Sequence, residues 1–197
     1  AAMSRPRSVS DRRVFEALRG TIGAAGPAGW TLRQVADRAG LSPPTLVQRF
    51  GSKRALLAAY LDDLADRAAD AFPPGEPDDD PLDRLHAALL DDLGGAEADP
   101  ASVGHWLALR QIAAADPELR LRVRRAARRR RKAIRKLLNE AVVAGQLRRS
   151  TRVRRLARAV EVTAEGAAAG WTIHRTRSLR QSLRREIQRV LGPWLRR

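Results

Sequence analysis

Residues 30–53, WTLRQVADRAGLSPPTLVQRFGSK, decide the fold. Apolar residues recur at helical spacing over residues 32–39 and predict a short helix whose apolar face must be covered by a neighbour. Gly40 has the backbone freedom to end that helix and reverse the chain. Ser42 as the N-cap and Pro43 at the first helical position then begin a second helix. The stretch therefore predicts a helix-turn-helix.

The second predicted helix has two different faces. Leu46 and Phe50 are four residues apart, so we expect them to face the core, with Val47 beside them. Glutamine can form two hydrogen bonds with adenine and arginine two with guanine, so the opposite face has the chemistry to read bases in the DNA major groove. An ordinary solvated helix face has the same pattern, and the helix alone does not decide between them. The residues of that opposite face are Thr45, Gln48, Arg49 and Ser52.

A longer pattern surrounds these two helices. The order of its residues resembles the tetracycline-repressor (TetR) family over about the first 60 residues. The resemblance implies an all-α, dimeric transcriptional repressor. Its N-terminal domain, residues 1–52, would bind DNA through three helices, and its C-terminal domain, residues 53–197, would bind a small effector and dimerise. The pattern consists of Thr31, Val35-Ala36, Ala39-Gly40-Leu41-Ser42, Thr45-Leu46, Phe50, Ser52-Lys53 and Leu56-Leu57.

The resemblance also assigns contacts to individual residues. Thr31 and Lys53 would hold DNA phosphates. Three positions depart from the family: glycine is usual where Pro44 stands, a phosphate-touching tyrosine at Val47, and an aromatic residue or histidine at Arg49. Residue reasoning and resemblance together give the expected DNA-binding set of Thr31, Arg33, Ser42, Pro43, Thr45, Gln48, Arg49 and Lys53.

Composition narrows the remaining classes. The chain has no cysteine, so disulfides and thiolate metal sites are excluded. No apolar run approaches the roughly 20 residues that span a bilayer, and the N-terminus lacks an apolar signal region, so we expect a cytoplasmic protein without a membrane partner. Its histidines, His86, His105 and His174, lack metal-ligand spacing, and no glycine-rich phosphate loop or nucleophile motif is present. We therefore expect no catalytic residue, metal or cofactor.

The charge of +16 is distributed in three blocks. Residues 1–60 carry 10 basic and 3 acidic side chains, residues 61–116 carry 3 and 14, and residues 117–197 carry 25 and 5. A basic first block suits a DNA-binding domain, because neutralising phosphates releases counterions. The dense run at residues 120–136 has three interpretations: a second nucleic-acid surface, a site for an anionic ligand, or a solvated face partly paired with the acidic block. The first would make the chain a sequence-independent nucleic-acid-binding protein, which is the alternative to a regulator.

Helix signals cover the rest of the chain. A capping box at residues 8–11 begins a first helix, with a glycine-rich connecting loop at residues 23–29. A fourth helix is expected at residues 53–71, followed by an acidic, proline-rich loop at residues 72–81. Aspartate followed by proline marks three further helix starts, and glycine closes the third of these helices. The marking pairs are Asp80-Pro81, Asp99-Pro100 and Asp116-Pro117, and the closing residue is Gly145.

Two more helices complete the count of about nine, with no strand. We expect one to open at Ser150 and the other at a capping box formed by Ser178 and Gln181. Both have apolar stripes, and Gly166 and Gly170 would let another helix approach closely, so we predict a homodimer through the last two helices. For an effector pocket the sequence offers only polar-tipped or aromatic residues on aliphatic helices. These candidates are Tyr60, His86, His105, Trp106, Arg110 and Trp171.

Overall fold

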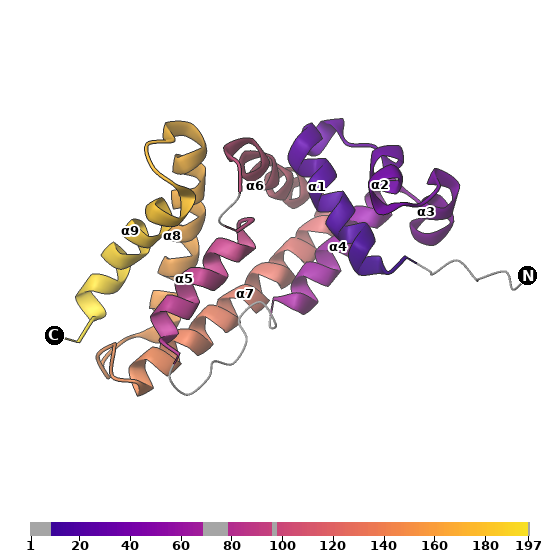
Figure 1. The fold of residues 1–197 in the computed structure, drawn as a ribbon. Coiled ribbons are helices and arrows are strands. Elements are labelled where there is room, and N and C mark those ends of the chain that lie inside the picture. Colours follow the sequence, from indigo (N-terminus) through magenta and orange to yellow (C-terminus); the bar gives the residue numbers. More distant parts are fainter. Residues whose placement is uncertain (1–8, 69–78, 96–97, 197) are drawn as a thin grey trace, which may run out of the picture.

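The computed structural model describes residues 9–68, 79–95 and 98–196, and the statements below concern these residues. They form nine α-helices and a short 3-10 helix without a strand, which confirms the all-α prediction (Figure 1). The helices are α1 (Asp11–Gly29), α2 (Leu32–Ala39), α3 (Pro43–Phe50), α4 (Lys53–Arg67), α5 (Pro81–Asp92), α6 (Pro100–Ala115), α7 (Pro117–Val143), α8 (Val153–His174) and α9 (Leu179–Leu191), and the 3-10 helix is Gly192–Trp194.

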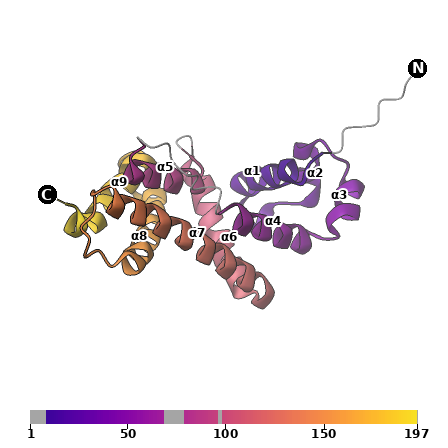
Figure 2. The same ribbon diagram turned by 90° about the horizontal axis from the view of Figure 1, so that it is seen from below.

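The first four helices gather at one end of the molecule, and α5, α8 and α9 at the other (Figures 1 and 2). The core of the first end joins α1 to α4 around Leu18, Trp30 and Leu46, none more than 1% exposed. Leu109 of α6 and Leu119 of α7 belong to the same core. The N-terminal helices therefore rest on α6 and α7 through shared apolar packing.

A second core lies among α5, α7, α8 and α9. Ile134 and Leu138 on α7 are fully buried there, with Leu85 of α5, Val160 of α8 and Ile187 of α9. Because α7 has 27 residues, it spans about 40 Å and contributes to both cores. A long, stiff element thus connects the two ends of the molecule.

Most of the predicted helix starts are confirmed. Each marked aspartate accepts hydrogen bonds from first-turn amides of its own helix, as the N-cap role requires. The capping box at Ser178 and Gln181 is present, and Gly145 follows α7 with φ 75°. The first helix begins later than the predicted capping box at residues 8–11 implies, because its N-cap is Ser10, whose side chain accepts from the amide of Arg13. No described helix is both long enough and apolar enough to cross a membrane.

Two predicted boundaries are wrong. The expected loop at residues 23–29 is instead the last part of α1, which only kinks at Gly26 with φ 77°. Gly23 lies inside the helix for packing, because a Cβ there would come within 2.9 Å of the Ser102 hydroxyl on α6. Ser150 does not cap α8, which begins two residues after Thr151, whose hydroxyl donates to the carbonyl of Arg148 within a turn.

Some predictions concern residues that the structure does not describe. The start of the first capping box at residue 8 is one of them. The proline-rich loop predicted at residues 72–81 lies outside the described residues up to residue 78. The fourth helix, predicted to reach residue 71, is described to Arg67, with Ala68 as its C-cap.

Candidate DNA-binding site and ligand pockets

The helix-turn-helix is built by caps at each junction. Thr31 caps α2 and shares a capping box with Gln34. Gly40 adopts the left-handed conformation at φ 74°, and the amide of Leu41 donates back to the carbonyl of Ala36. This hydrogen bond closes the end of α2 and turns the chain into α3. Packing then fixes the angle between the two helices, because Val35, Ala36, Ala39 and Leu46 are fully buried.

At the start of α3, few backbone amide hydrogens need a water molecule as hydrogen-bond partner. Ser42 Oγ accepts the amide of Thr45 at 3.3 Å, and Pro43 and Pro44 have no amide hydrogen to satisfy. The helix is short, and Leu46 is its one fully buried side chain. In Figure 1, α3 lies at the end of the molecule farthest from the C-terminus.

The position of Val47 differs from the expected division of α3 into a core face and an exposed face. We expected it beside the core, but its side chain is 45% exposed. The reason is geometric: Val47 lies about 100° around the helix from Leu46, and only one narrow stripe of α3 meets α2 and α4. Thr45 and Gln48 are also exposed, so the outer surface of α3 comprises Thr45, Val47 and Gln48. An apolar residue thus stands in the middle of the polar face.

Arg49 points away from that surface. Its guanidinium donates to the carbonyl of Val9 at 2.5 Å and forms an ion pair with Asp11, at the beginning of α1. It also lies 5.5 Å from the centroid of the Phe50 ring. In this arrangement Arg49 ties α3 to α1, and it would have to leave these partners to reach a base.

Lys53 is held in a similar way. Its ammonium donates to the carbonyls of Trp30 at 2.6 Å and Ala28 at 3.4 Å, and it lies 4.5 Å from the centroid of the Trp30 ring. Lys53 therefore joins the beginning of α4 to the end of α1 and to the residue between α1 and α2. Arg33, in the first turn of α2, is exposed and has no hydrogen bond to the described residues. The expected set thus contains free side chains and side chains already engaged within the chain.

The ligand candidates do not converge on one cavity. Tyr60 and Trp106 pack together, with ring centroids 5.5 Å apart, and Tyr60 also contacts Phe15 at 5.9 Å. Burial raises the pKa of Tyr60 to about 12, so its hydroxyl stays protonated. These rings belong to the core shared by α1, α4 and α6.

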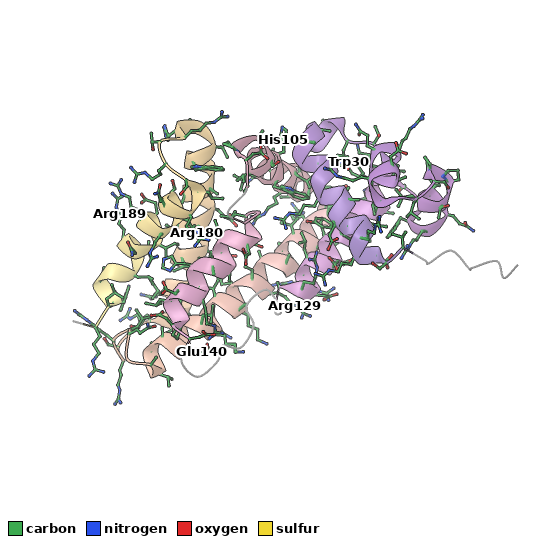
Figure 3. All side chains as sticks on the ribbon, in the orientation of Figure 1. Trp30, His105, Arg129, Glu140, Arg180 and Arg189 are labelled. Carbon is green, nitrogen blue, oxygen red and sulfur yellow. The ribbon has the colours of Figure 1, made fainter. Side chains whose placement is uncertain are left out.

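His105 completes a helix that proline interrupts. In an uninterrupted α1 the carbonyl of Gly23 would accept the amide of residue 27, but Pro27 has none. His105 Nδ1 lies 2.7 Å from that carbonyl oxygen and donates to it, because a carbonyl can only accept. His105 thus fastens α6 to the kink in α1. Figure 3 shows His105 where α6 lies beside α1.

The other three ligand candidates are distributed over the C-terminal helices. His86 lines a cavity between α5 and α9. Trp171 lines an open groove of about 600 Å³ between α8 and α9, and its indole N–H donates to the carbonyl of Arg177. Arg110 forms an ion pair with Glu165 at 2.6 Å.

Arg110 belongs to a buried charge network that sequence reasoning missed. Its centre is Arg130 on α7, which is 8% exposed and pairs with Asp92 of α5 at 2.7 Å, with Glu165 of α8 and, at 3.5 Å, with Glu161 of α8. Glu161, 4% exposed, pairs with Arg131 at 2.5 Å. Burial raises the pKa of Glu165, but the charges of Arg110 and Arg130 outweigh it and hold that pKa below its usual value. Apolar spacing gives no signal for such a network, because Arg130 lies within a run that resembles a solvated face.

The basic run at residues 120–136 is partly neutralised. Arg122 pairs with Asp62 at 3.0 Å and Arg125 with Asp66 at 2.8 Å, which matches the interpretation of pairing with the acidic block. Figure 3 shows Arg129 where α7 passes α4, and it lies 3.9 Å from Asp66. Among the described residues, five exposed side chains of the run have no ion-pair partner: Arg120, Arg124, Arg128, Lys132 and Lys136.

The geometry defines a class of protein. An exposed short helix behind a glycine turn, fixed on a small helical unit and joined to a larger helical body, is the architecture of a helix-turn-helix DNA-binding regulator.

Comparison with protein families defines the class of this protein further. A profile described as "Bacterial regulatory proteins, tetR family" matches residues 14–60. A second, described as "BetI-type transcriptional repressor, C-terminal", matches residues 81–192, which is more than half of the chain. The chain belongs to the TetR family of transcriptional regulators. A comparison with curated proteins found no match.

Solved structures share the fold at low sequence identity. A TetR transcription regulator from Haloarcula marismortui aligns with a TM-score of 0.73 and 22% identity, over 94% of this chain and 98% of that one. A putative TetR-family regulator from a Rhodococcus species gives 0.71 and 23%, over 94% and 99%. SmeT, described as the repressor of the Stenotrophomonas maltophilia multidrug efflux pump SmeDEF, gives 0.65 and 18%, over 96% and 92%.

Proposed function

We propose that the chain is a cytoplasmic, homodimeric repressor that binds an inverted-repeat DNA operator through α3 and responds to a small-molecule effector. The observation that carries the proposal is that α3 has one buried side and one exposed side. One side is locked by Leu46, while Thr45, Val47 and Gln48 face solvent at the end of the molecule. The side-chain amide of Gln48 and the hydroxyl of Thr45 can form hydrogen bonds with base edges, and Val47 can contact the methyl group of thymine.

Dimerisation is supported by an unoccupied face of α8. Val162 and Ile173 on this helix are 61% and 73% exposed. At Gly166 and Gly170 an added Cβ would meet nothing within 4 Å, so packing within the chain does not require glycine there. A second copy of the same surface would bury these residues against each other around a two-fold axis. Such a dimer would present two α3 helices to half-sites one or more helical turns of DNA apart, with one turn measuring about 34 to 36 Å.

Coupling between effector and DNA can pass through α6 and α7. His105 on α6 is hydrogen-bonded to α1, and five residues further along the same helix Arg110 is paired with α8. A ligand that binds the C-terminal helices would shift α6 only if it prefers one of two positions of that helix. Under this mechanism the effector changes the spacing of the α3 helices and lowers operator affinity.

The test is selection of bound sequences from a random duplex library. We expect the wild-type protein to enrich an inverted repeat, and the Gln48→Ala variant to relax the preference at one position of each half-site, because one side chain reads few bases. The matched control is Arg149→Ala, which removes an exposed charge from the α7–α8 connection, far from α3, and should select the wild-type sequence. Absence of any enriched motif with wild-type protein would refute the proposal.

The same library separates Gln48 from Arg49. We expect Arg49→Ala to weaken binding to all sequences together, since its guanidinium holds α3 against α1 in the free chain. A base-specific change in the Arg49→Ala variant would instead place Arg49 on a base. An unaltered preference in the Gln48→Ala, Arg49→Ala double variant would remove both residues from sequence reading.

A further inference from the structure

A partly enclosed cavity of about 250 Å³ lies between α5 and α9. It is separate from the α8–α9 groove, because the two cavities share no lining residue. Figure 3 shows Arg180 on α9, next to α5. Apolar side chains form one part of the wall and charged or polar side chains the other. From α5 the wall includes Asp83, His86 and Leu90, and from α9 it includes Arg180, Leu183 and Arg184.

His86, which lines this cavity, has a hydrogen-bonding atom that is unsatisfied. Its Nδ1 lies 2.6 Å from the carbonyl oxygen of Leu82 and must therefore carry a hydrogen. Its Nε2 is buried and has no partner. Burial lowers the pKa of His86, and the charge of Arg184 acts in the same direction against Asp83 and Asp80. In the neutral ring Nε2 is an acceptor, so a residue that lines the cavity keeps a buried lone pair that lacks a donor.

Two guanidinium groups line the α9 side of the cavity. Arg180 and Arg184 are four residues apart and so lie on the same side of the helix. Arg184 is 3.5 Å from Asp83, with both side chains more than half exposed, while Arg180 has no ion-pair partner among the described residues. With neutral His86, the two arginines and Asp83 leave one net positive charge at the cavity.

We propose that the α5–α9 cavity binds a small carboxylate that also carries a hydroxyl group. The carboxylate lies between Arg180 and Arg184, whose planar groups bond carboxylate oxygens in pairs. The hydroxyl donates to Nε2 of His86. One negative charge matches the net charge of the cavity, whereas a phosphate monoester would bring close to two negative charges beside Asp83. The volume is below the range for drug-sized ligands, so the ligand is small.

This site goes beyond the proposed function. Binding is a property of the free protein, and it stands whether or not the chain reads a DNA sequence. It is also separate from the exposed face of α8, since the α9 residues that line this cavity, Arg180, Leu183 and Arg184, do not line the groove between α8 and α9.

The experiment observes the histidine rings of the full-length protein by NMR at pH 7 and constant ionic strength. The chain has three histidines, so each ring can be assigned by single substitution. The probes are lactate, propanoate, which lacks the hydroxyl, and inorganic phosphate. We expect lactate to shift the His86 signals saturably and to leave those of His105 and His174 unmoved. Propanoate should bind about two- to tenfold more weakly, which corresponds to one net hydrogen bond.

Two variants and a matched control make the test specific. The Arg180→Gln, Arg184→Gln double variant should lose the lactate response of His86. The control, Arg154→Gln with Arg158→Gln, removes two exposed arginines with the same spacing from α8 and should respond as wild type. His86→Phe, followed through the methyl signals of Leu90 and Leu183, should bind lactate and propanoate equally.

The outcomes are decisive in both directions. A saturable His86 response that depends on the two arginines and on the hydroxyl supports the proposal. A wild-type protein whose His86 signals do not respond to lactate overturns it, and so does a lactate response that survives in the Arg180→Gln, Arg184→Gln variant. Tighter binding of phosphate than of lactate overturns the assignment of a carboxylate. An absent DNA preference, with lactate binding intact, would refute the regulator and leave this site standing.

Discussion

Replacing Arg130 by methionine should destabilise the protein far more than the same change at a neighbouring arginine. Arg130 is 8% exposed, and its guanidinium reaches carboxylates on two helices, Asp92 on α5 and both Glu161 and Glu165 on α8. Methionine fills most of the volume but carries no charge. The variant therefore keeps the packing of α7 and leaves the carboxylates facing one another without their shared cation.

The size of the expected loss of stability depends on which ion pairs remain after the substitution. Removing one partner from a buried ion pair costs about 3–5 kcal/mol. Glu165 still has Arg110 at 2.6 Å, and Glu161 still has Arg131 at 2.5 Å, so we expect the lower end, about 3 kcal/mol. For a chain of this size that corresponds to a fall in melting temperature of about 6–12 °C.

The assay is urea and thermal unfolding followed by circular dichroism at pH 7 and one fixed protein concentration, since dimerisation links stability to concentration. The matched control is Arg128→Met, an exposed arginine of the same run, which should stay within about 0.5 kcal/mol of wild type. Equal stability of the two variants would refute the reasoning that the buried network holds α5, α7 and α8 together.

The pH dependence of stability provides a second check on the same charge network. The folded state holds the pKa of Glu165 below its usual value, so this group contributes stability above its unfolded pKa, and that contribution is lost as the pH falls through the folded pKa. Without Arg130 the pKa of Glu165 rises towards its unfolded value. The stability difference between wild type and Arg130→Met should therefore stay constant from pH 7 to about 4.5 and narrow as the pH falls below 4.5 towards the folded pKa of Glu165. A difference that stays constant below pH 4.5 as well would contradict this explanation.

Three further predictions address other parts of the molecule. Gly166→Leu or Gly170→Leu should weaken the dimer in sedimentation velocity while leaving the helical content unchanged, because a side chain there meets only open space in its own chain; an unchanged dimer would place the interface elsewhere. An NMR titration of His86 should give a pKa below 6.5, since burial disfavours the charged ring, and a value above 6.5 would contradict its buried setting. Replacing Arg124 and Arg128 by glutamine should leave the salt dependence of operator binding unchanged, whereas a slope reduced by about two units would show that this face contacts DNA phosphates.

Much of the fold could be predicted because its signals are local. Three aspartate-proline pairs, the serine and threonine caps and the positive-φ glycines each act within one turn of the chain, so residues at fixed spacing were enough. The same local logic failed at the end of α1. Gly23 and Gly26 looked like a loop, but the partner that uses them is α6, about 80 residues later, whose His105 and Ser102 fit against the kinked helix.

In the candidate sites, too, local features could be predicted from the sequence, and contacts between distant segments could not. That Ser42 caps α3 and that Gln48 is exposed follows from helix geometry alone. That Arg49 binds back to Asp11 and Val9 does not, because the partners come from another helix. Arg130 illustrates the limit most clearly: in the sequence it is one of four consecutive arginines, and only the placement of α5 and α8 distinguishes the buried one from its exposed neighbours.

The central claim is that α3 distinguishes one duplex sequence from another. The most direct measurement is a pair of equilibrium titrations at one fixed salt concentration, with the selected operator and with a scrambled duplex of the same length and composition. A regulator binds its site at least about a thousandfold more tightly than other DNA. We predict a ratio of that size for the wild-type protein and a clearly smaller ratio for Gln48→Ala. Equal affinity of the wild-type protein for both duplexes would contradict the account.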